Sequence, residues 1–328
     1  MGLSGAAVLA VDGGGSKTDA VLFGLDGEVL ARARHGSGSP QVLGLHAAMA
    51  VVDAAVGEVL GQVPGAEVVR AHAYLSGLDL PEEVTAFRAV AAGAAWAPND
   101  DAALQIDNDM FALLRAGTAE PDAVAVVCGT GINAIGVRRD GATVRFPAFG
   151  AITGDWGGGW QLGERAMWHA ARAGDGRGPA TSLTERIPLE FGLESVDAVI
   201  RALHFDRLPS AALSRLCPTV FAAATAGDEI AGRLVDRQAE EIVILAVTTL
   251  RRLDLLHAEV PVVLGGGLIA SGDERLLGGI RSGIAAASPA ARPIEVSAPP
   301  VVGAALLAAE GAGLGPSAIE RLRAGLAG

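Results

Sequence analysis

The 328-residue chain has few aromatic residues, only two cysteines and no long uninterrupted apolar run. Cys128 and Cys217 lie far apart and form no Cys-x-x-Cys or Cys/His spacing, which argues against a disulfide framework or a zinc site and favours a reducing compartment. The apolar run from Ile242 to Val247 is much shorter than the roughly 20 residues of a membrane-spanning helix. The N-terminus lacks the basic segment of an export signal. We therefore expect a soluble, cytoplasmic protein without a membrane partner.

Positive charge is also scarce, because 37 acidic and 25 basic side chains give a formal net charge of −12 at pH 7, and no basic run occurs. Such a surface repels a phosphate backbone, so we do not expect nucleic acid as a ligand. Half of the residues are hydrophobic, which is ample for buried cores and suggests two domains. The 45 glycines are too numerous to be informative singly, so only those in a repeated pattern carry weight.

Hydrophobic periodicity predicts an α/β protein in which the opening order of elements repeats. The first half is expected to have strands at 6–12, 18–25, 28–35, 68–75 and 104–106, with helices at 42–60 and 81–92. The second half is expected to have strands at 123–128, 132–137, 144–146, 262–264 and 294–297, with helices over most of 155–258 and at 273–286 and 302–313. We expect two domains, residues 1–118 and 119–314, with a cleft between them, a helical insertion in the second, and a C-terminal helix at about 315–328 that can pack back on the first.

The first expected hairpin contains a glycine-rich turn that runs from Asp12 to Thr18. Its three consecutive glycines, Gly13, Gly14 and Gly15, allow backbone amides to point at one anion, and Ser16 could bond a phosphate oxygen. Asp12 ends the strand and is placed to hold Mg²⁺ through water. A plain hairpin turn is the alternative interpretation.

Two further glycine turns follow expected strands in the second half. The turn Gly129-Thr130-Gly131 has the same context as the first, and two such turns facing one another would clamp a polyphosphate, with Thr130 as a second hydroxyl donor. The turn formed by Gly265, Gly266 and Gly267 follows a buried strand and precedes a helix, which would place it against the nucleoside. Neither a Walker A loop nor a GxGxxG turn occurs at these positions.

A candidate general base lies between the first two turns, at the carboxyl end of an expected strand. Functional acids commonly occupy such positions in α/β folds, and a kinase needs one carboxylate to accept the proton of the attacking hydroxyl. Asp109, which follows Asn108, is that candidate. The alternative is that Asp109 only caps a helix that begins at Met110. The whole pattern favours the base.

The segment Gly154-Asp155-Trp156-Gly157-Gly158-Gly159-Trp160 combines an acid, glycines and indoles. A carboxylate accepts hydrogen bonds from sugar hydroxyls, and an indole covers the apolar side of a pyranose. Asp155 and Trp156 are therefore the candidates for sugar binding. For Trp160 and Trp168, a place in the hydrophobic core is about as plausible.

These motifs together resemble the BadF/BadG/BcrA/BcrD-type ATPase family, and within it the N-acetylglucosamine kinase branch of the sugar kinase/actin superfamily. The resemblance spans nearly the whole chain and implies a homodimer of two ribonuclease-H-like domains that close over ATP-Mg and a hexosamine, with Asp109 activating the sugar 6-hydroxyl. The residues it assigns to ATP and its phosphates are Gly13, Gly14, Gly15, Ser16, Lys17, Thr18, Gly129, Thr130, Gly131, Gly265, Gly266 and Gly267. The residues it assigns to the sugar are Ser39, Asn108, Asp109, Ala148, Phe149, Gly150, Asp155 and Trp156.

The chain departs from the family pattern only on the sugar side. Ser39 stands where the family has a sugar-binding asparagine, and Phe149 stands where a tryptophan is usual. The family's GDEGSG reads GDWGGG at residues 154–159. The phosphate chemistry is therefore expected to follow the family, whereas glucosamine, N-acetylmuramic acid or another hexose stays open as the sugar.

The sequence disfavours two other classes of protein. The family's hydrolysing ATPases that activate dehydratases carry a dimer-bridging iron–sulfur cluster, and Cys128 and Cys217 do not have the spacing for one. Sugar-sensing repressors with a kinase body need a DNA-binding domain ahead of the first phosphate turn, and here that turn starts at residue 12. An ATP-dependent amino-sugar kinase that uses Mg²⁺ is the expectation.

Overall fold

The computed structural model describes residues 5–327 and divides into two compact units. The first unit runs to Glu120 and resumes at Val296, and the second is Pro121–Glu295. We expected the second domain to continue to residue 314. Instead, α12 (Pro300–Gly311) belongs to the first unit, because its apolar residues pack against α4 (Asp109–Gly117) and β1 (Ala6–Gly13).

The first unit contains a five-stranded sheet in the order β3-β2-β1-β4-β5. An antiparallel hairpin joins β1 to β2 (Thr18–Gly24), and β3 (Val29–His35) pairs with β2. The strands β4 (Glu67–Leu75) and β5 (Leu104–Asn108) are parallel to β1. The last of these is two residues longer than we expected, so Asn108 lies inside the sheet.

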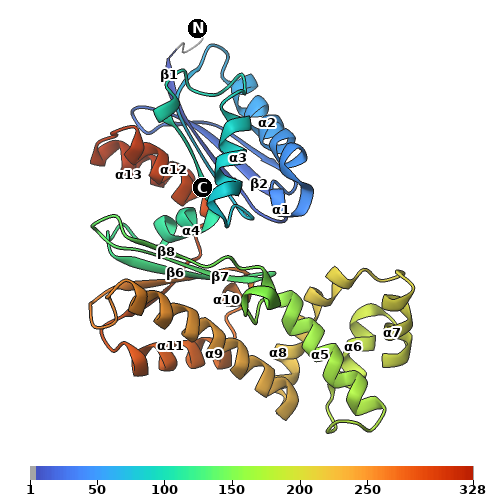
Figure 1. Ribbon diagram of the computed structural model, residues 1–328. Helices are drawn as coiled ribbons and strands as arrows, with labels where there is room; N and C mark the ends of the chain where they lie inside the picture. The colour runs from blue at the N-terminus through green and yellow to red at the C-terminus, as the bar shows by residue number, and fades with distance from the viewer. Residues whose placement is uncertain (1–4, 328) are drawn as a thin grey trace. The chain divides into compact units, whose positions relative to one another are not determined.

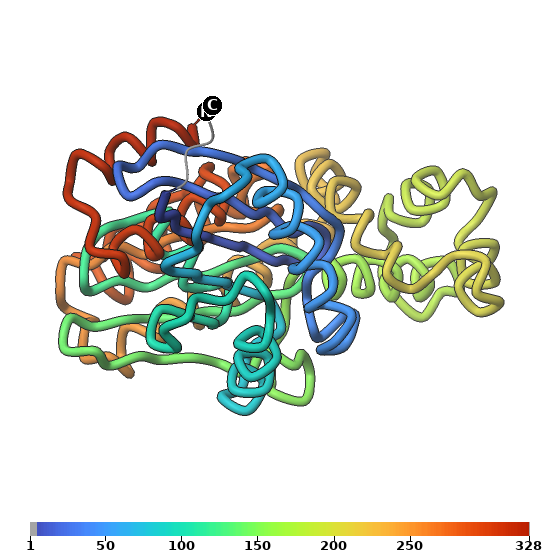
Figure 2. Tube along the Cα trace, turned by 90° about the horizontal axis from the view of Figure 1, so that it is seen from above, coloured from blue at the N-terminus to red at the C-terminus, as the bar shows by residue number. Residues whose placement is uncertain are grey.

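Helices cover both faces of this sheet (Figure 1). On one face lie α1 (Pro40–Leu43), α2 (Leu45–Gln62) and α3 (Pro81–Ala91), and on the other lie α4, α12 and α13 (Pro316–Leu326). We expected one helix over 42–60, but Gly44 adopts φ +82° and divides it into α1 and α2. Figure 2 shows α13 lying along the β2–β3 hairpin, and Arg321 there forms an ion pair with Asp26 at 2.8 Å.

A buried histidine lies on the α12 face of the first sheet. The Nδ1 atom of His72 is 3.1 Å from the hydroxyl of Tyr74, and within residues 5–327 its Nε2 atom has no hydrogen-bond partner. Burial is the main cause that lowers the pKa of His72 to about 4, and the charge of Arg70 adds to it. The folded protein therefore holds His72 neutral, whereas the unfolded chain protonates it near pH 6.5.

We expect this histidine to make the fold sensitive to mild acid. Since its folded pKa is depressed, its contribution is complete above pH 6.5 and is lost as the pH falls toward 4. Between pH 7 and pH 5 the loss should be about 2 kcal/mol of unfolding free energy. Urea titrations at both pH values, on the wild type and on His72→Gln, measure it. The same pH dependence in both proteins would contradict the prediction.

The second unit has a five-stranded sheet in the order β10-β9-β6-β7-β8. The strands β6 (Ala123–Cys128), β7 (Ile132–Val137) and β8 (Thr143–Arg145) form an antiparallel meander, while β9 (Pro261–Gly265) and β10 (Arg292–Glu295) continue the sheet in parallel. The helices α9 (Glu229–Arg252) and α11 (Glu274–Ala287) pack together beneath it (Figure 1).

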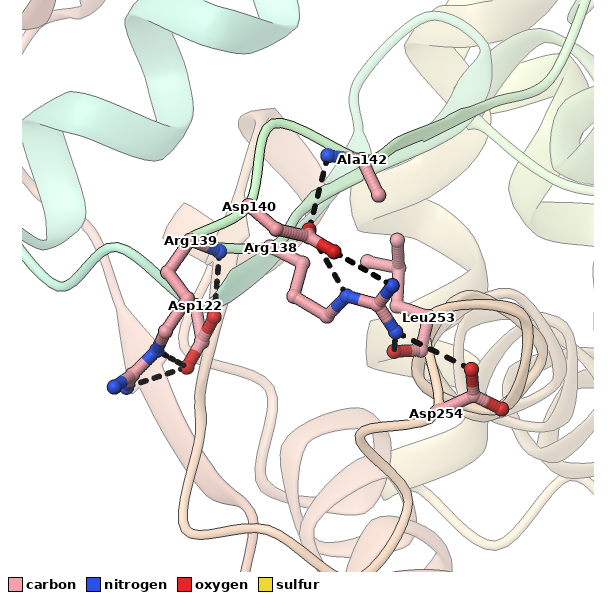
Figure 3. Close-up of polar contacts among 7 residues, drawn as sticks. All are labelled: Asp122, Arg138, Arg139, Asp140, Ala142, Leu253 and Asp254. Carbon is pink, nitrogen blue, oxygen red and sulfur yellow. Dashed lines mark hydrogen bonds and ion pairs between the residues drawn. The ribbon is translucent and has the colours of Figure 1, made fainter.

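The C-terminal end of α9 is fastened to the β7–β8 hairpin (Figure 3). The guanidinium of Arg138 donates to the carbonyl of Leu253 at 2.8 Å, to Asp254 at 3.2 Å, and to Asp140 in its own turn. An arginine that binds the last carbonyls of a helix also complements the negative end of the helix dipole. This contact fixes where α9 lies along the sheet.

A helical insertion follows the meander. It comprises α5 (Gly159–Gly174), α6 (Leu183–Phe191), α7 (Val196–His204) and α8 (Cys217–Thr225), and within the second unit α6 and α7 project farthest from the sheet (Figures 1 and 2). We expected a mainly helical stretch here, and that prediction is confirmed. Among residues 5–327, no helix is both long enough and apolar enough to span a bilayer.

Candidate active site

Three parallel strands of the first unit end at the same level, and this places the predicted residues together. Gly13 pairs with Leu75, and Leu75 pairs with Asn108. The carboxyl ends of β1, β4 and β5 therefore meet at one edge of the sheet. In open α/β sheets this edge is where ligands bind.

The glycine turn after β1 is closed by its own backbone. The amide of Gly14 donates to the carbonyl of Lys17 at 2.8 Å, while the carbonyl of Gly14 accepts from the amide of Gly38 at 3.2 Å. Gly15 and Ser16, at the tip, are exposed, and half-buried Lys17 forms an ion pair with Asp19 at 3.4 Å. The Thr18 hydroxyl is buried and donates to the carbonyl of Gly36 at 2.9 Å. The tip can bind an anion, while Thr18 shapes the turn.

Ser39 lies next to this turn, but its side chain is buried. Its hydroxyl donates to the carbonyl of Ser76 at 3.0 Å, which joins the loop after β3 to the loop after β4. Gly77 adopts φ +80° beside it, where a Cβ atom would lie 3.0 Å from the Ser39 hydroxyl oxygen. This serine fastens two loops, and its contact with a sugar stays a prediction.

Carboxylates gather at this edge of the sheet. Burial and the charges of Asp109 and Asp19 raise the pKa of Asp12 well above its usual range, against an opposing effect of Lys17. A divalent cation would relieve this repulsion, and Mg²⁺ is commonly held by one or two carboxylates, waters and substrate phosphates. Asp12 therefore suits the predicted role. Among residues 5–327, no group of three or more acidic, histidine or cysteine side chains forms a metal site, so phosphates and water would complete the shell.

Asp109 is the first residue of α4, and Asn108 caps that helix. The Oδ1 atom of Asn108 accepts from the amide of Met110 at 3.0 Å, and its Nδ2 atom donates to Asp79 Oδ1 at 3.0 Å and to the carbonyl of Leu78 at 3.3 Å. The alternative interpretation of Asp109 as the cap is therefore wrong. Burial, with the charge of Asp79, raises the pKa of Asp109 to about 7, so this carboxyl can exchange a proton near neutral pH.

The second glycine turn is braced by the start of α5. The amide of Gly159 donates to the carbonyl of Gly129 at 2.7 Å, and the amide of Trp160 donates to the carbonyl of Thr130 at 3.1 Å. Within a trans peptide the C=O and N–H bonds point in opposite directions. The amides of Thr130 and Gly131 therefore point away from α5, and their binding of a phosphate stays a prediction.

The third turn lies beside the second because β9 is parallel to β6, with Gly265 paired to Val127. Gly266 adopts φ +97° and sits so close to Cys128 that a Cβ atom would lie 2.4 Å from its carbonyl oxygen. A pocket of about 310 Å³ opens next to it, lined by Gly267, Leu268, Ser271, Asp273, Cys217, Pro218 and Phe221. This mainly apolar cavity with a few polar groups has the general character of a small-molecule site.

The residues predicted to contact the sugar in the second unit form one compact turn. Gly150–Thr153 is a short 3-10 helix, and the carboxylate of Asp155 accepts from the amide of Gly150 at 3.1 Å and from the Thr153 hydroxyl at 2.5 Å. Phe149 donates its amide to the same threonine at 2.9 Å. The structure therefore places Phe149 and Gly150, which follow Ala148, close to Asp155, and the contact of these residues with a sugar stays a prediction.

The three tryptophans of this region differ in how far they are exposed to solvent. Trp156 is half-buried against the core of the second unit, and the guanidinium of Arg237 lies 5.8 Å from the centre of its ring. Trp160 and Trp168 are 39% and 45% exposed, so the suggestion that they belong to the core is wrong. Their exposure arises because α5 is covered on one side only.

Two residues of the site were missed in the sequence. Asp79 follows β4 at the same edge as Asp12 and Asn108, and its position after a parallel strand was a usable signal. Gln238 lies on α9 and accepts from the amide of Gly158 at 2.9 Å. No motif marks Gln238, because only the tertiary fold brings it to the glycine segment.

The chain is similar to several proteins of known classification. It is 28% identical to an N-acetyl-D-glucosamine kinase of Dictyostelium discoideum, over 92% of this chain and 97% of the relative. It is 24% identical to an N-acetylmuramic acid/N-acetylglucosamine kinase of Clostridium acetobutylicum, over 80% and 85%. A solved structure from Chromobacterium violaceum, provisionally assigned as an N-acetylglucosamine kinase, matches with a TM-score of 0.72 and 26% identity, over 93% of this chain and 99% of that one.

These similarities confirm the predicted fold class of two actin-like α/β domains. A family model for the BadF/BadG/BcrA/BcrD ATPases matches residues 9–308, which is most of the chain. The match includes both phosphate turns, the candidate base and the third glycine turn. The chain belongs to the BadF/BadG/BcrA/BcrD ATPase family.

Proposed function

We propose that this protein is an ATP-dependent kinase that phosphorylates the 6-hydroxyl of an amino sugar, with N-acetylglucosamine as the preferred substrate. The observation that carries the proposal is Asp109, a half-buried carboxyl with a pKa raised to about 7 at the substrate edge of the first sheet. Because Asn108 caps α4, the carboxylate of Asp109 is not needed for capping and can serve a substrate. The two relatives named as N-acetylglucosamine kinases support the choice of sugar.

In the proposed reaction Asp109 accepts the proton of the sugar 6-hydroxyl while that oxygen attacks the γ-phosphorus of ATP. The bond from the γ-phosphorus to the bridging oxygen breaks, and ADP leaves with its electron pair. The amides of Thr130 and Gly131 and the tip at Gly15 and Ser16 bind phosphate oxygens. Mg²⁺ held by Asp12 would neutralise phosphate charge.

The nucleoside is proposed to occupy the pocket beside Gly267. Its walls are mainly apolar, from Leu268, Phe221 and Pro218, which suits the faces of a purine. Cys217 lies in the same wall, and its thiol donates to the carbonyl of Gly159 at 3.3 Å. The pocket therefore adjoins the start of α5, which braces the second phosphate turn.

N-Acetylmuramic acid is the second candidate substrate, because one relative carries both sugars in its name. Glucosamine and other hexoses differ from N-acetylglucosamine at the 2-position and stay open for the same site. A hydrolysing activator with an iron–sulfur cluster is disfavoured, since burial raises the pKa of Cys128 to about 12 and that of Cys217 to about 11. Buried structural cysteines of this kind are chemically inert.

A coupled assay of ADP release against a panel of sugars tests the proposal. N-Acetylglucosamine should give the highest kcat/KM, and mass spectrometry should find the product phosphorylated at the 6-position. ADP release that is independent of every sugar would favour a hydrolysing ATPase instead. Omission of Mg²⁺ from the assay would test the proposed cofactor. Fractionation of cells would test the cytoplasmic location, and light scattering would test the homodimer.

We expect Asp155→Asn to act mainly on sugar binding. The carboxylate accepts hydrogen bonds from Gly150 and Thr153 and would accept further ones from sugar hydroxyls, and hydrogen bonds to charged groups contribute about 1.5–3 kcal/mol. The sugar KM should therefore rise roughly 10- to 100-fold, with the ATP KM changed little. Steady-state kinetics in both substrates measure this. An unchanged sugar KM would remove Asp155 from the sugar site.

A further inference from the structure

The middle of α9 contacts the segment that precedes α5. Arg237 lies over the ring of Trp156, and Gln238 binds Gly158. Burial raises the pKa of Glu241, against the opposing charge of Arg237, and the charges of Glu240 and Asp155 make smaller contributions in the same direction as burial. Glu241 follows Gln238 by three positions and Arg237 by four, so the three residues lie within about 100° of one another around the helix axis. The C-terminal end of α9 is held by Arg138, which donates to the carbonyl of Leu253 (Figure 3).

Gln238 is the central contact, and it is fully buried. Its Oε1 atom accepts from the amide of Gly158 at 2.9 Å, whereas within residues 5–327 its Nε2 atom has no hydrogen-bond partner. Gly157 packs on that amide group, since a Cβ atom there would lie 2.6 Å from Nε2. An unpaired buried donor is unfavourable, and an apolar side chain of similar size would avoid it. Packing alone therefore does not account for a glutamine.

Gly158, in turn, rests directly on the second phosphate turn. It adopts φ +81°, and a Cβ atom there would lie 2.4 Å from the Cα atom of Gly131. The next two amides, of Gly159 and Trp160, bind the carbonyls of that turn. A hydrogen bond on the amide of Gly158 therefore sets the position from which α5 braces the phosphate turn.

We infer that Gln238 is a positioning residue for ATP, which acts through Gly158 to direct the amides of Thr130 and Gly131 at a phosphate. The inference rests on the proposed role of this turn in nucleotide binding. Gln238 itself touches no substrate, since it is fully buried beneath the segment. Its loss should shift the turn without removing any group that contacts ATP.

Two substitutions of Gln238 distinguish the effect of its acceptor oxygen from the effect of its packing. Gln238→Leu removes the oxygen that holds Gly158, whereas Gln238→Glu keeps an oxygen acceptor, because burial favours the protonated acid. Thr249→Val is the matched control, since Thr249 is also fully buried on α9 and donates to the carbonyl of Leu245 at 2.7 Å, away from the segment. Each variant is measured for ADP affinity by calorimetry without sugar, for both KM values and for Tm.

Gln238→Leu should weaken ADP binding and raise the ATP KM by roughly 10- to 100-fold, with the sugar KM within about threefold of the wild type. Gln238→Glu should recover most of the affinity, and Thr249→Val should leave it unchanged. Wild-type nucleotide affinity in Gln238→Leu would overturn the inference, as would an equal loss in Thr249→Val. A wild type that binds ADP but phosphorylates no sugar would overturn the kinase proposal alone, because the comparison of ADP affinities would still decide the role of Gln238.

Discussion

Asp109→Asn should lower the turnover of the enzyme by roughly 10²- to 10⁴-fold, which is the usual contribution of a general base. The change preserves shape and removes only the group that accepts the proton of the sugar hydroxyl. Burial raises the pKa of the native carboxyl to about 7, so at neutral pH about half of the molecules hold it ionised. Single-turnover kinetics with the best sugar of the panel measure the loss at the chemical step.

The fold supplies the control for this experiment. Since Asn108 caps α4 through the amide of Met110, the asparagine at 109 should leave the helix intact, and loss of a carboxyl whose charge is disfavoured by burial should not lower the Tm. Asn108→Ala, by contrast, removes the cap and should cost about 1 kcal/mol of stability. ATP binding by Asp109→Asn should equal that of the wild type. Turnover close to wild type in this variant would refute Asp109 as the base and revive the hydrolysing ATPase.

Gly158→Ala should reduce kcat/KM for ATP by more than about 100-fold, because displacement of a reactive group by about 1 Å has effects of this size. Gly158 has φ +81°, which alanine adopts only with strain, and the new methyl group would lie 2.4 Å from the Cα atom of Gly131 and 2.6 Å from the carbonyl oxygen of Thr130. Both neighbours are backbone atoms, so the turn itself has to move. Initial rates at varied ATP and sugar measure the effect.

Gly278→Ala is the matched control for that substitution. Gly278 lies within α11, and a Cβ atom there would meet no atom within 4 Å. Alanine at this position should therefore leave the kinetics unchanged and stabilise the helix by roughly 0.5–1 kcal/mol. If Gly158→Ala retained normal ATP kinetics, the close packing of this segment on the turn would have no role in nucleotide binding.

The features that the sequence predicted are those set by neighbouring residues. Asp12 and the glycines after it mark the end of β1, and Pro81 marks the start of α3 at its first helical position, which is where proline is favoured. The break at Gly44 was missed because apolar spacing continues through it from Val42. The placement of α12 was missed because strand and helix patterns do not record which sheet a helix covers.

The parts of the candidate site that could be predicted from the sequence are likewise those marked by local patterns. Its glycine turns and Asp109 follow strand ends, and strand ends can be located from hydrophobic runs. Gln238 is 80 residues from the glycine it binds, and its neighbours on α9 give no local signal. The alternative interpretation of Asp109 gave it the capping role that Asn108 has in the structure, because helix starts are uncertain by a residue or two in sequence.

The division of the first unit between the two ends of the chain imposes an order on folding during synthesis. The second unit is one continuous segment, Pro121–Glu295, and all its strands are synthesised before α12. One face of the β1–β2 hairpin carries Val8, Ala10 and Phe23 and is covered by α12. This face therefore stays uncovered until the last tenth of the chain has been synthesised. A chain truncated before residue 300 and released from the ribosome should thus hold a finished second unit and an open first sheet, whose apolar face is a binding surface for chaperones.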